Sequence, residues 1–173
     1  MAQIGEKAPH FALQNSEGKV IDLDDYIGKG PIVVLFFPLA FTGVCTTEMC
    51  TIRDNMKAMS ESDATVFGIS VDSFFTLAQF KSMNNLNFDL LSDFNKKAIR
   101  AYDVYNSDHF GMDGVAKRSA FVIDKGGVIQ YAEVLNDAGH EPNYSTILAR
   151  QKRSITVNIC IWARQKRSTT VNI

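Results

Sequence analysis

Two cysteines five positions apart, Cys45 and Cys50, are the residues whose type and spacing point most directly to chemistry. A cysteine attacks an electrophile as its thiolate, and the N-terminus of a helix favours an anion through its unpaired amides and its dipole. Thiols in such positions have pKa values of roughly 3.5–7.5 instead of about 8.5. The residues around Cys45 predict this position, so we expect a reactive thiolate there.

The placement of Cys45 at a helix N-terminus is inferred from a predicted strand followed by a predicted helix. Residues 31–37 are mostly β-branched or aromatic and are followed by Pro38, which predicts a buried strand. Apolar residues then recur at intervals of four, three, four and three and predict a helix over 42–59: Cys45, Met49, Ile52, Met56 and Met59. Thr42 fits an N-cap whose hydroxyl accepts a first-turn N–H, which would make Cys45 the third helical residue.

The alternative to a chemical role for Cys45 is a structural one. A lone cysteine on an apolar stripe commonly packs as a small core residue. The strand–loop–helix placement, the preceding proline and threonine, and the second cysteine together favour chemistry.

The pattern Pro38-x-x-x-Thr42-x-x-Cys45 resembles the signature of the peroxiredoxins, thiol peroxidases with a thioredoxin-like fold. A Cys-x4-Cys helix is similar to the bacterioferritin comigratory protein or peroxiredoxin Q branch. The resemblance covers about residues 3–148 and includes four further segments: 5–11, 68–73, 87–93 and 116–124. It departs from the family at His10, where an acidic residue is usual. The resemblance implies reduction of hydrogen peroxide and organic hydroperoxides.

The resemblance also assigns roles around the thiolate. A thiolate that attacks one peroxide oxygen needs the other oxygen stabilised as negative charge leaves. In the family, the threonine and arginine that match Thr42 and Arg118 hold the peroxide against the thiolate, and Pro38 would shield it from water. Glu48 lies one helical turn beyond Cys45 and either orients Arg118 by pairing with it or simply complements the helix dipole.

Cys50 is expected to resolve oxidised Cys45. Five helical residues separate two Cα atoms by about 7.5 Å along the axis and about 140° around it, so the helix must unwind before a disulfide closes. The family spacing implies that a Cys45 sulfenic acid condenses with Cys50, and that a thioredoxin-like or other dithiol reductant reopens the bond. Two alternatives stay open: a one-cysteine enzyme resolved by an external thiol, and a peroxide-responsive regulator or holdase chaperone.

The remaining elements alternate along the chain. Strands are expected at 11–13, 20–23, 32–37, 65–70, 88–90, 119–123 and 128–134, and helices at 42–59, 73–83, 95–102 and from about 141. This order predicts an α/β protein of the thioredoxin-like type, with a mixed central sheet flanked by helices and an N-terminal β-hairpin. Residues 106–116 read as a polar loop, in which His109 and Phe110 either line the site mouth or cover the loop.

Length and composition agree with one soluble domain. The 173 residues are 46% hydrophobic, and no apolar run reaches the roughly 18 residues of a membrane span. Residues 1–6 lack the charge and apolar run of an export signal, and the odd cysteine count fits catalytic thiols, so we expect a cytoplasmic location. No metal or cofactor is expected, because the cysteines lack a second ligand pair and His10, His109 and His140 are scattered.

The end of the chain does not fit the family pattern. Residues 149–159 return at 163–173 with one difference, and the segment 149–173 has six basic residues and no acidic one. We therefore divide the chain into a peroxiredoxin domain, 1–148, and a basic extension, 149–173. The extension either docks on an acidic surface, a neighbouring subunit or nucleic acid, or is a duplication without selected function. Cys160, between the copies, is a possible further resolving thiol.

The expected partners follow from the predicted activity and composition. They are a hydroperoxide substrate, a dithiol reductant and further copies of the chain in a homodimer or higher homo-oligomer. Neither a membrane nor a nucleic acid is expected as a partner.

Overall fold

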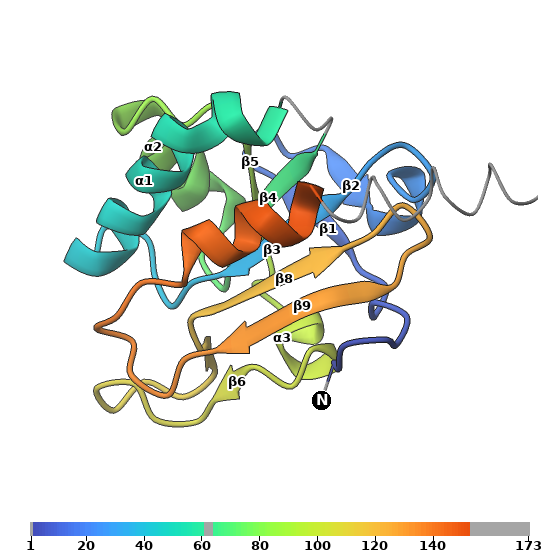
Figure 1. Ribbon diagram of the computed structural model, residues 1–173. Helices are drawn as coiled ribbons and strands as arrows, with labels where there is room; N and C mark the ends of the chain where they lie inside the picture. Colours follow the sequence, from blue (N-terminus) through green and yellow to red (C-terminus); the bar gives the residue numbers. More distant parts are fainter. Residues whose placement is uncertain (1, 61–63, 153–173) are drawn as a thin grey trace, which may run out of the picture.

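The computed structural model describes residues 2–60 and 64–152, and within them a seven-stranded sheet forms the centre of the molecule (Figure 1). The strands lie in the order β2-β1-β5-β4-β3-β8-β9. Their bounds are β1 Ala12–Asn15, β2 Val20–Asp22, β3 Ile32–Phe36, β4 Thr65–Ser70, β5 Asp89–Ser92, β8 Ser119–Ile123 and β9 Ile129–Val134. Strands β3, β4 and β5 are parallel, whereas the outer strands pair antiparallel. The predicted mixed sheet with an N-terminal hairpin is therefore confirmed.

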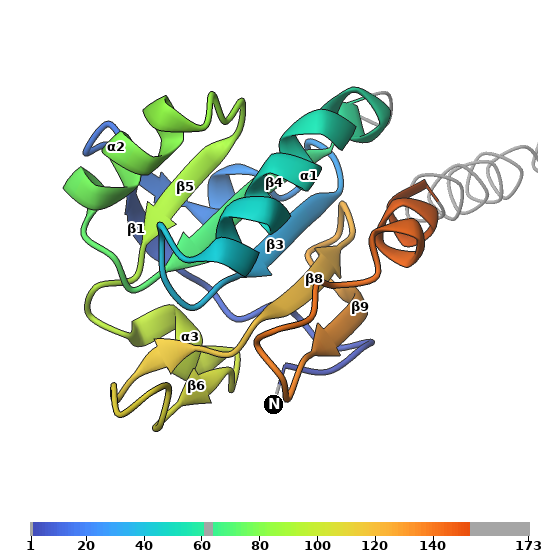
Figure 2. The same ribbon diagram turned by 90° about the vertical axis from the view of Figure 1, so that its left-hand side faces the viewer.

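Helices cover both faces of the sheet (Figures 1 and 2). The helices are α1 Gly43–Ser60, α2 Phe74–Met83, α3 Lys97–Ala101, the short 3-10 helix Leu23–Asp25 and a helix at 144–152. Side chains of α1, α2 and the helix at 144–152 share one core, and those of α3 share the other. Each core lies between the sheet and the helices that cover it.

Strand β3 supplies both cores because its side chains alternate between the two faces. Ile32, Val34 and Phe36 pack on the α3 side, while Val33, Leu35 and the following Phe37 pack on the α1 side. A strand that is buried on both faces has a continuous run of apolar residues, and the sequence has such a run at this strand. The end of this strand therefore fixes where the segment leading to Cys45 begins.

A glycine lets α1 lie close to the sheet. A Cβ atom on Gly68 of β4 would lie 2.7 Å from Leu90 Cδ2 and 3.2 Å from the Met49 sulfur. Since real Cβ atoms essentially never come within 3.0 Å of another atom, a larger residue would displace the Leu90 side chain and crowd Met49 of α1. Gly68 therefore leaves room for the Met49 side chain of the helix that bears both cysteines.

Most predicted bounds differ from the structure by one to three residues, and the helix expected from about 141 begins at 144. Two differences have a local explanation. Helix α3 begins at Lys97 instead of 95, because the buried Asp93 carboxylate accepts the backbone N–H groups of Lys97 and Ile99, both at 2.8 Å. Lys96 has a left-handed backbone with φ 59°, which stops the helix from starting earlier. The predicted loop 106–116 is bounded by a small ladder formed by β6, Tyr105–Asn106, and β7, Val115–Ala116.

The chain end is described only in part. The helix at 144–152 runs across the predicted domain boundary at 148, and Gln151 within it is fully buried. The repeated sequence from 153 onward and Cys160 lie outside the described residues, so the division into domain and extension stays a prediction. Among the helices that are described, none combines the length and the apolar character needed to cross a membrane.

Candidate active site

The first turn of α1 positions Cys45. The helix begins at Gly43, and the Thr46 N–H donates to the Thr42 carbonyl oxygen at 2.9 Å, so Thr42 is the N-cap residue and Cys45 the third helical residue, as predicted. The predicted capping role of the Thr42 hydroxyl is wrong. Its hydroxyl donates to the Leu39 carbonyl oxygen at 3.0 Å rather than accepting a first-turn N–H, which closes the loop before the helix.

The Cys45 thiol lies at the bottom of a pocket of about 570 Å³. Pro38, Thr42 and Arg118 line this pocket with it, so four of the six predicted site residues share one cavity. Cys45 is 1% exposed, and Pro38 is buried beside it. A substrate must therefore enter the pocket before it reaches the sulfur.

Arg118 connects the thiol to the opposite side of the site. It precedes β8, is 1% exposed, and donates from Nη2 to the Cys45 sulfur at 3.3 Å. Its Nη1 donates to Glu48 Oε2, and its Nε and Nη2 donate to the Ala138 carbonyl oxygen at 3.2 and 2.8 Å. The guanidinium is thus held on three sides, and its position is fixed before any substrate binds.

Glu48 is the buried counter-charge of Arg118. It is fully buried, and its Oε1 has no hydrogen-bond partner among the described residues. Burial raises the pKa of Glu48 to about 8, against the opposite effect of Arg118. Burial disfavours the charged guanidinium as well, but Glu48 and Cys45 outweigh this effect and raise the pKa of Arg118. Of the two roles left open for Glu48, the structure supports the pairing with Arg118.

Cys50 lies apart from this pocket. It is half-buried on α1, and its sulfur is 3.9 Å from Asn84 Oδ1, next to the C-terminal end of α2. Both cysteines are free thiols within a continuous helix, Gly43–Ser60. A Cys45–Cys50 disulfide therefore cannot form in this conformation unless α1 first unwinds.

The turn after β9 completes the site and was not predicted from sequence. Besides the Ala138 carbonyl contact, the Leu135 N–H donates to the Arg118 carbonyl oxygen at 2.9 Å. Asp137 shapes this turn, since its carboxylate accepts the Gly139 N–H at 2.8 Å and pairs with His140 at 3.1 Å. A backbone acceptor leaves no trace in residue type, and the composition Asn-Asp-Ala-Gly at 136–139 is typical of a turn but not of a site.

The segment 106–112 forms another wall of the pocket. Asn106, Asp108, His109, Phe110 and Met112 all line it. His109 and Phe110 therefore lie at the site mouth, which settles the choice that the sequence left open. Phe110 is 92% exposed, so it presents an apolar ring at the entrance.

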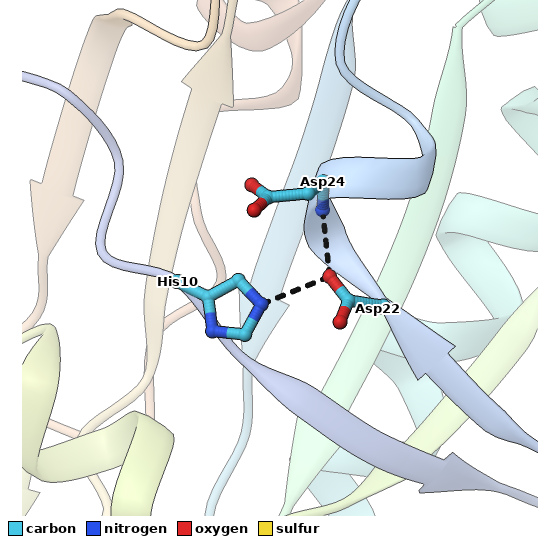
Figure 3. A group of neighbouring side chains, drawn as sticks. All are labelled: His10, Asp22 and Asp24. Carbon is cyan, nitrogen blue, oxygen red and sulfur yellow. Dashed lines mark hydrogen bonds and ion pairs between the residues drawn. The ribbon is translucent and has the colours of Figure 1, made fainter.

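Away from the site, His10 lies beside two carboxylates (Figure 3). Its Nε2 is 2.9 Å from Asp22 Oδ1, and the same oxygen accepts the Asp24 N–H at 2.9 Å. The Asp24 bond, and then His10, lower the pKa of Asp22. This group caps the 3-10 helix at Leu23–Asp25, and these contacts account for it without a metal ion.

The fold and the site together define a class of protein: a thioredoxin-like α/β chain with a buried, arginine-bound thiol at a helix N-terminus. The sequence profile of the AhpC/TSA family matches residues 4–132. Peroxiredoxin Bcp of Bacillus subtilis (strain 168) is 41% identical over 127 residues, which cover 72% of this chain and 80% of that protein. Alkyl hydroperoxide reductase E of Mycobacterium tuberculosis is 34% identical over 136 residues, which cover 78% and 86%.

Solved structures agree with these relatives. Peroxidoxin BcpB from Mycobacterium tuberculosis superposes with a TM-score of 0.79 at 27% identity, over 88% of this chain and 98% of that one. The chain belongs to the AhpC/TSA family, and the resemblance to the Bcp branch of the peroxiredoxins is confirmed. Its fold is the thioredoxin-like fold of that class, and its activity is that of a thiol-dependent peroxidase.

Proposed function

We propose that the protein reduces hydrogen peroxide and organic hydroperoxides with Cys45 as the nucleophile. The observation that carries this proposal is the bond from Arg118 Nη2 to the buried Cys45 sulfur, 3.3 Å long, inside the pocket. The positive guanidinium favours the thiolate form of Cys45. Because it lies beside the sulfur, it can also stabilise the negative charge that develops on the leaving oxygen of the peroxide.

The first step is a displacement at oxygen. The Cys45 thiolate attacks one peroxide oxygen, the O–O bond breaks, and an S–O bond forms to give the sulfenic acid. The other oxygen leaves as an alkoxide or hydroxide, which takes up a proton and departs as an alcohol or water. Thr42 donates its hydroxyl hydrogen to Leu39, so its lone pairs are left to accept the O–H of a bound hydroperoxide.

The dimensions and lining of the pocket support organic hydroperoxides among the substrates. About 570 Å³ is far more than hydrogen peroxide fills, because hydrogen peroxide has only two oxygen atoms and a water molecule, with one, occupies about 30 Å³ in the liquid. Leu39, Val44, Phe110 and Met112 give the pocket apolar surface next to the polar end at Arg118. The name of the mycobacterial relative, alkyl hydroperoxide reductase E, is consistent with such substrates.

The second step joins the two thiols of α1. Cys50 attacks the Cys45 sulfenic sulfur, a disulfide forms and water leaves. Because Cys50 faces Asn84 rather than the pocket, the first turns of α1 must unwind first. A thioredoxin-like dithiol then reduces the disulfide and restores both thiols. Resolution by an external thiol is the competing route, with Cys50 passive.

Peroxide turnover combined with peptide mapping tests these steps. The protein with thioredoxin and its reductase should consume hydrogen peroxide and an alkyl hydroperoxide, and one equivalent of peroxide should give a Cys45–Cys50 peptide pair. A stable sulfenic acid with Cys50 free would favour the external thiol. A link from Cys45 to Cys160 would move the resolving role to the chain end.

The setting of the enzyme is part of the same proposal. A cytoplasmic location fits free thiols that cycle through a dithiol reductant. A homodimer or higher homo-oligomer is the expected assembly, and its interface would cover exposed apolar side chains such as Phe75 and Phe94, which are 72% and 65% exposed. Light scattering of the reduced and oxidised protein tests the assembly.

A further inference from the structure

A carboxylate outside the pocket holds the loop that leads into α1. Asp72 follows β4, and its Oδ2 accepts the backbone N–H of Ala40 at 2.8 Å and the hydroxyl of Ser70 at 2.8 Å. Ser70 is fully buried and Ala40 is 8% exposed, so water competes little for these bonds. The carboxylate therefore ties the loop after β3 to the end of the neighbouring strand.

The loop needs this external support because part of its backbone is unfavourable. Phe41, directly after Ala40, has φ 65°, a left-handed conformation that a bulky residue rarely adopts. Such a conformation persists only where the surroundings fix it. The Asp72 bond fixes the preceding residue, and the Phe41 ring packs on Phe80 of α2 with 5.1 Å between ring centroids.

Asp72 is itself well anchored. Its own N–H donates to the Ser70 hydroxyl at 3.2 Å, and its carbonyl oxygen accepts the Ser92 hydroxyl at 2.6 Å. Ser70 and Ser92 end the two neighbouring parallel strands β4 and β5. The loop before Cys45 is thus tied, through one side chain, to the rigid edge of the sheet.

We propose that Asp72 is a positioning residue that holds the loop 38–42 in its peroxide-binding form and so controls how readily the first turn of α1 unwinds. It acts through Ala40, two positions before Thr42 and five before Cys45. The part of this inference that concerns unwinding rests on the proposed Cys45–Cys50 disulfide.

The two steps of the reaction place opposite demands on this contact. Attack on peroxide requires the folded loop, with Thr42 and Cys45 in the pocket. Disulfide formation requires the same turn to open. The sulfenic acid either meets Cys50 or reacts with a second peroxide to give the sulfinic acid, and that second attack again uses the folded pocket. Loss of the Asp72 contact must therefore slow the first oxidation and protect against the second.

Three variants separate this role from general stability. Asp72→Ala leaves the buried Ala40 N–H without its acceptor, whereas Asp72→Asn retains an oxygen that both donors can reach. Ser73→Ala is the matched control, because Ser73 caps α2 by accepting the Thr76 N–H at 3.2 Å. It lies in the same connection as Asp72, and its hydroxyl bonds are made within α2.

The measurements are the second-order rate of Cys45 oxidation and the sulfinic fraction after excess peroxide, read by mass spectrometry. Asp72→Ala should lower the rate about tenfold, the effect of losing one well-buried hydrogen bond, and should lower the sulfinic fraction as well. Asp72→Asn should restore both values, and Ser73→Ala should match the wild type in both. If Asp72→Ala does not fold, Asp72→Glu, which displaces the carboxylate by one methylene, should show the same pair of changes at smaller amplitude.

Two results would overturn the inference. One is an unchanged rate and sulfinic fraction in the folded alanine or glutamate variant. The other is an equal effect in Ser73→Ala, which would reduce Asp72 to a general stabilising residue. Failure of the proposed function is distinguishable, because neither the wild type nor any position-72 variant would then give a Cys45–Cys50 disulfide.

Discussion

Arg118 Nη2 lies 3.3 Å from the Cys45 sulfur across 73 positions of sequence, and the same guanidinium is bonded to Glu48 one helical turn beyond the cysteine. One buried cation therefore bonds two buried groups, the Cys45 thiol and the Glu48 carboxyl, and it stabilises the negatively charged form of each. Glu48 and the Ala138 carbonyl oxygen hold the guanidinium in place, so that its Nη2 is already directed at the thiol before a substrate binds.

Replacing Arg118 tests this relationship. Arg118→Ala should slow Cys45 oxidation by about 10²-fold or more, as loss of a charge-stabilising donor does. Arg118→Lys should recover only part of the rate, because it keeps the charge but cannot bond the sulfur, Glu48 and Ala138 with one planar group. Rapid-mixing measurements of peroxide consumption give the rates. A rate equal to that of the wild type in the alanine variant would remove Arg118 from the reaction.

Glu48 should give the protein a distinctive pH dependence. Its pKa is raised from 4.5 to about 8, so between these values the unfolded chain has lost a proton that the folded chain keeps. The free energy of unfolding should therefore fall as the pH rises through this window. Glu48→Gln removes this titrating group, so the melting temperature of the variant should rise relative to that of the wild type as the pH increases from about 5 to about 8. Each kcal/mol of relative stability corresponds to about 2–4 °C in melting temperature. Parallel melting curves for the two proteins would contradict the raised pKa.

The two cysteines should differ in which step they support. Cys45→Ser should abolish turnover, because no nucleophile remains in the pocket. Cys50→Ser should retain the first oxidation at the wild-type rate, since Cys50 lies outside the pocket lining, but should stall thioredoxin-driven cycling. Single-turnover and steady-state assays on the same variants separate the two effects. Undiminished cycling in Cys50→Ser would assign resolution to another thiol.

Truncation of the chain should distinguish the helix at 144–152 from the repeated sequence. Deleting 149–173 removes the fully buried Gln151 and should lower the melting temperature. Deleting only 153–173 removes four basic residues and keeps the helix, and turnover should survive it because every assigned residue lies before 120.

Calorimetry and light scattering at low and high salt tell whether the removed segment docks on an acidic surface. Contacts of that kind weaken with added salt. A loss of turnover on deleting 153–173 would mean that the chain end contributes to the site.

The site residues that lie close to Cys45 in the sequence could be predicted. Strands β4 and β8 match their predicted bounds, and spacing placed Cys45 at the third helical position and Glu48 one turn beyond it, where it bonds Arg118. Arg118 came from the family resemblance, since a lone arginine before a strand has no periodic signature. The Thr42 hydroxyl was assigned the wrong partner because Thr42 can serve as the N-cap through its carbonyl while its side chain turns back to Leu39.

The long-range contacts were beyond local patterns. The Ala138 carbonyl and the Asp72–Ala40 bond join segments through backbone atoms, which every residue type carries. The β6–β7 ladder was missed because strands of two residues show no periodicity. Helix α3 was predicted too long because the Asp93 side chain bonds to its first turn from outside the helix. Such contacts depend on how the sheet brings its strand ends together.

The measurement that tests the central claim most directly is residue-resolved thiol loss after mixing reduced protein with less than one equivalent of peroxide. Samples are quenched with a thiol-blocking reagent and read by mass spectrometry. We predict that Cys45 is oxidised first, at a rate orders of magnitude above that of free cysteine, although it is only 1% exposed. Oxidation of Cys45 at the rate of free cysteine, or after another thiol of the chain, would contradict its role as the peroxidatic nucleophile.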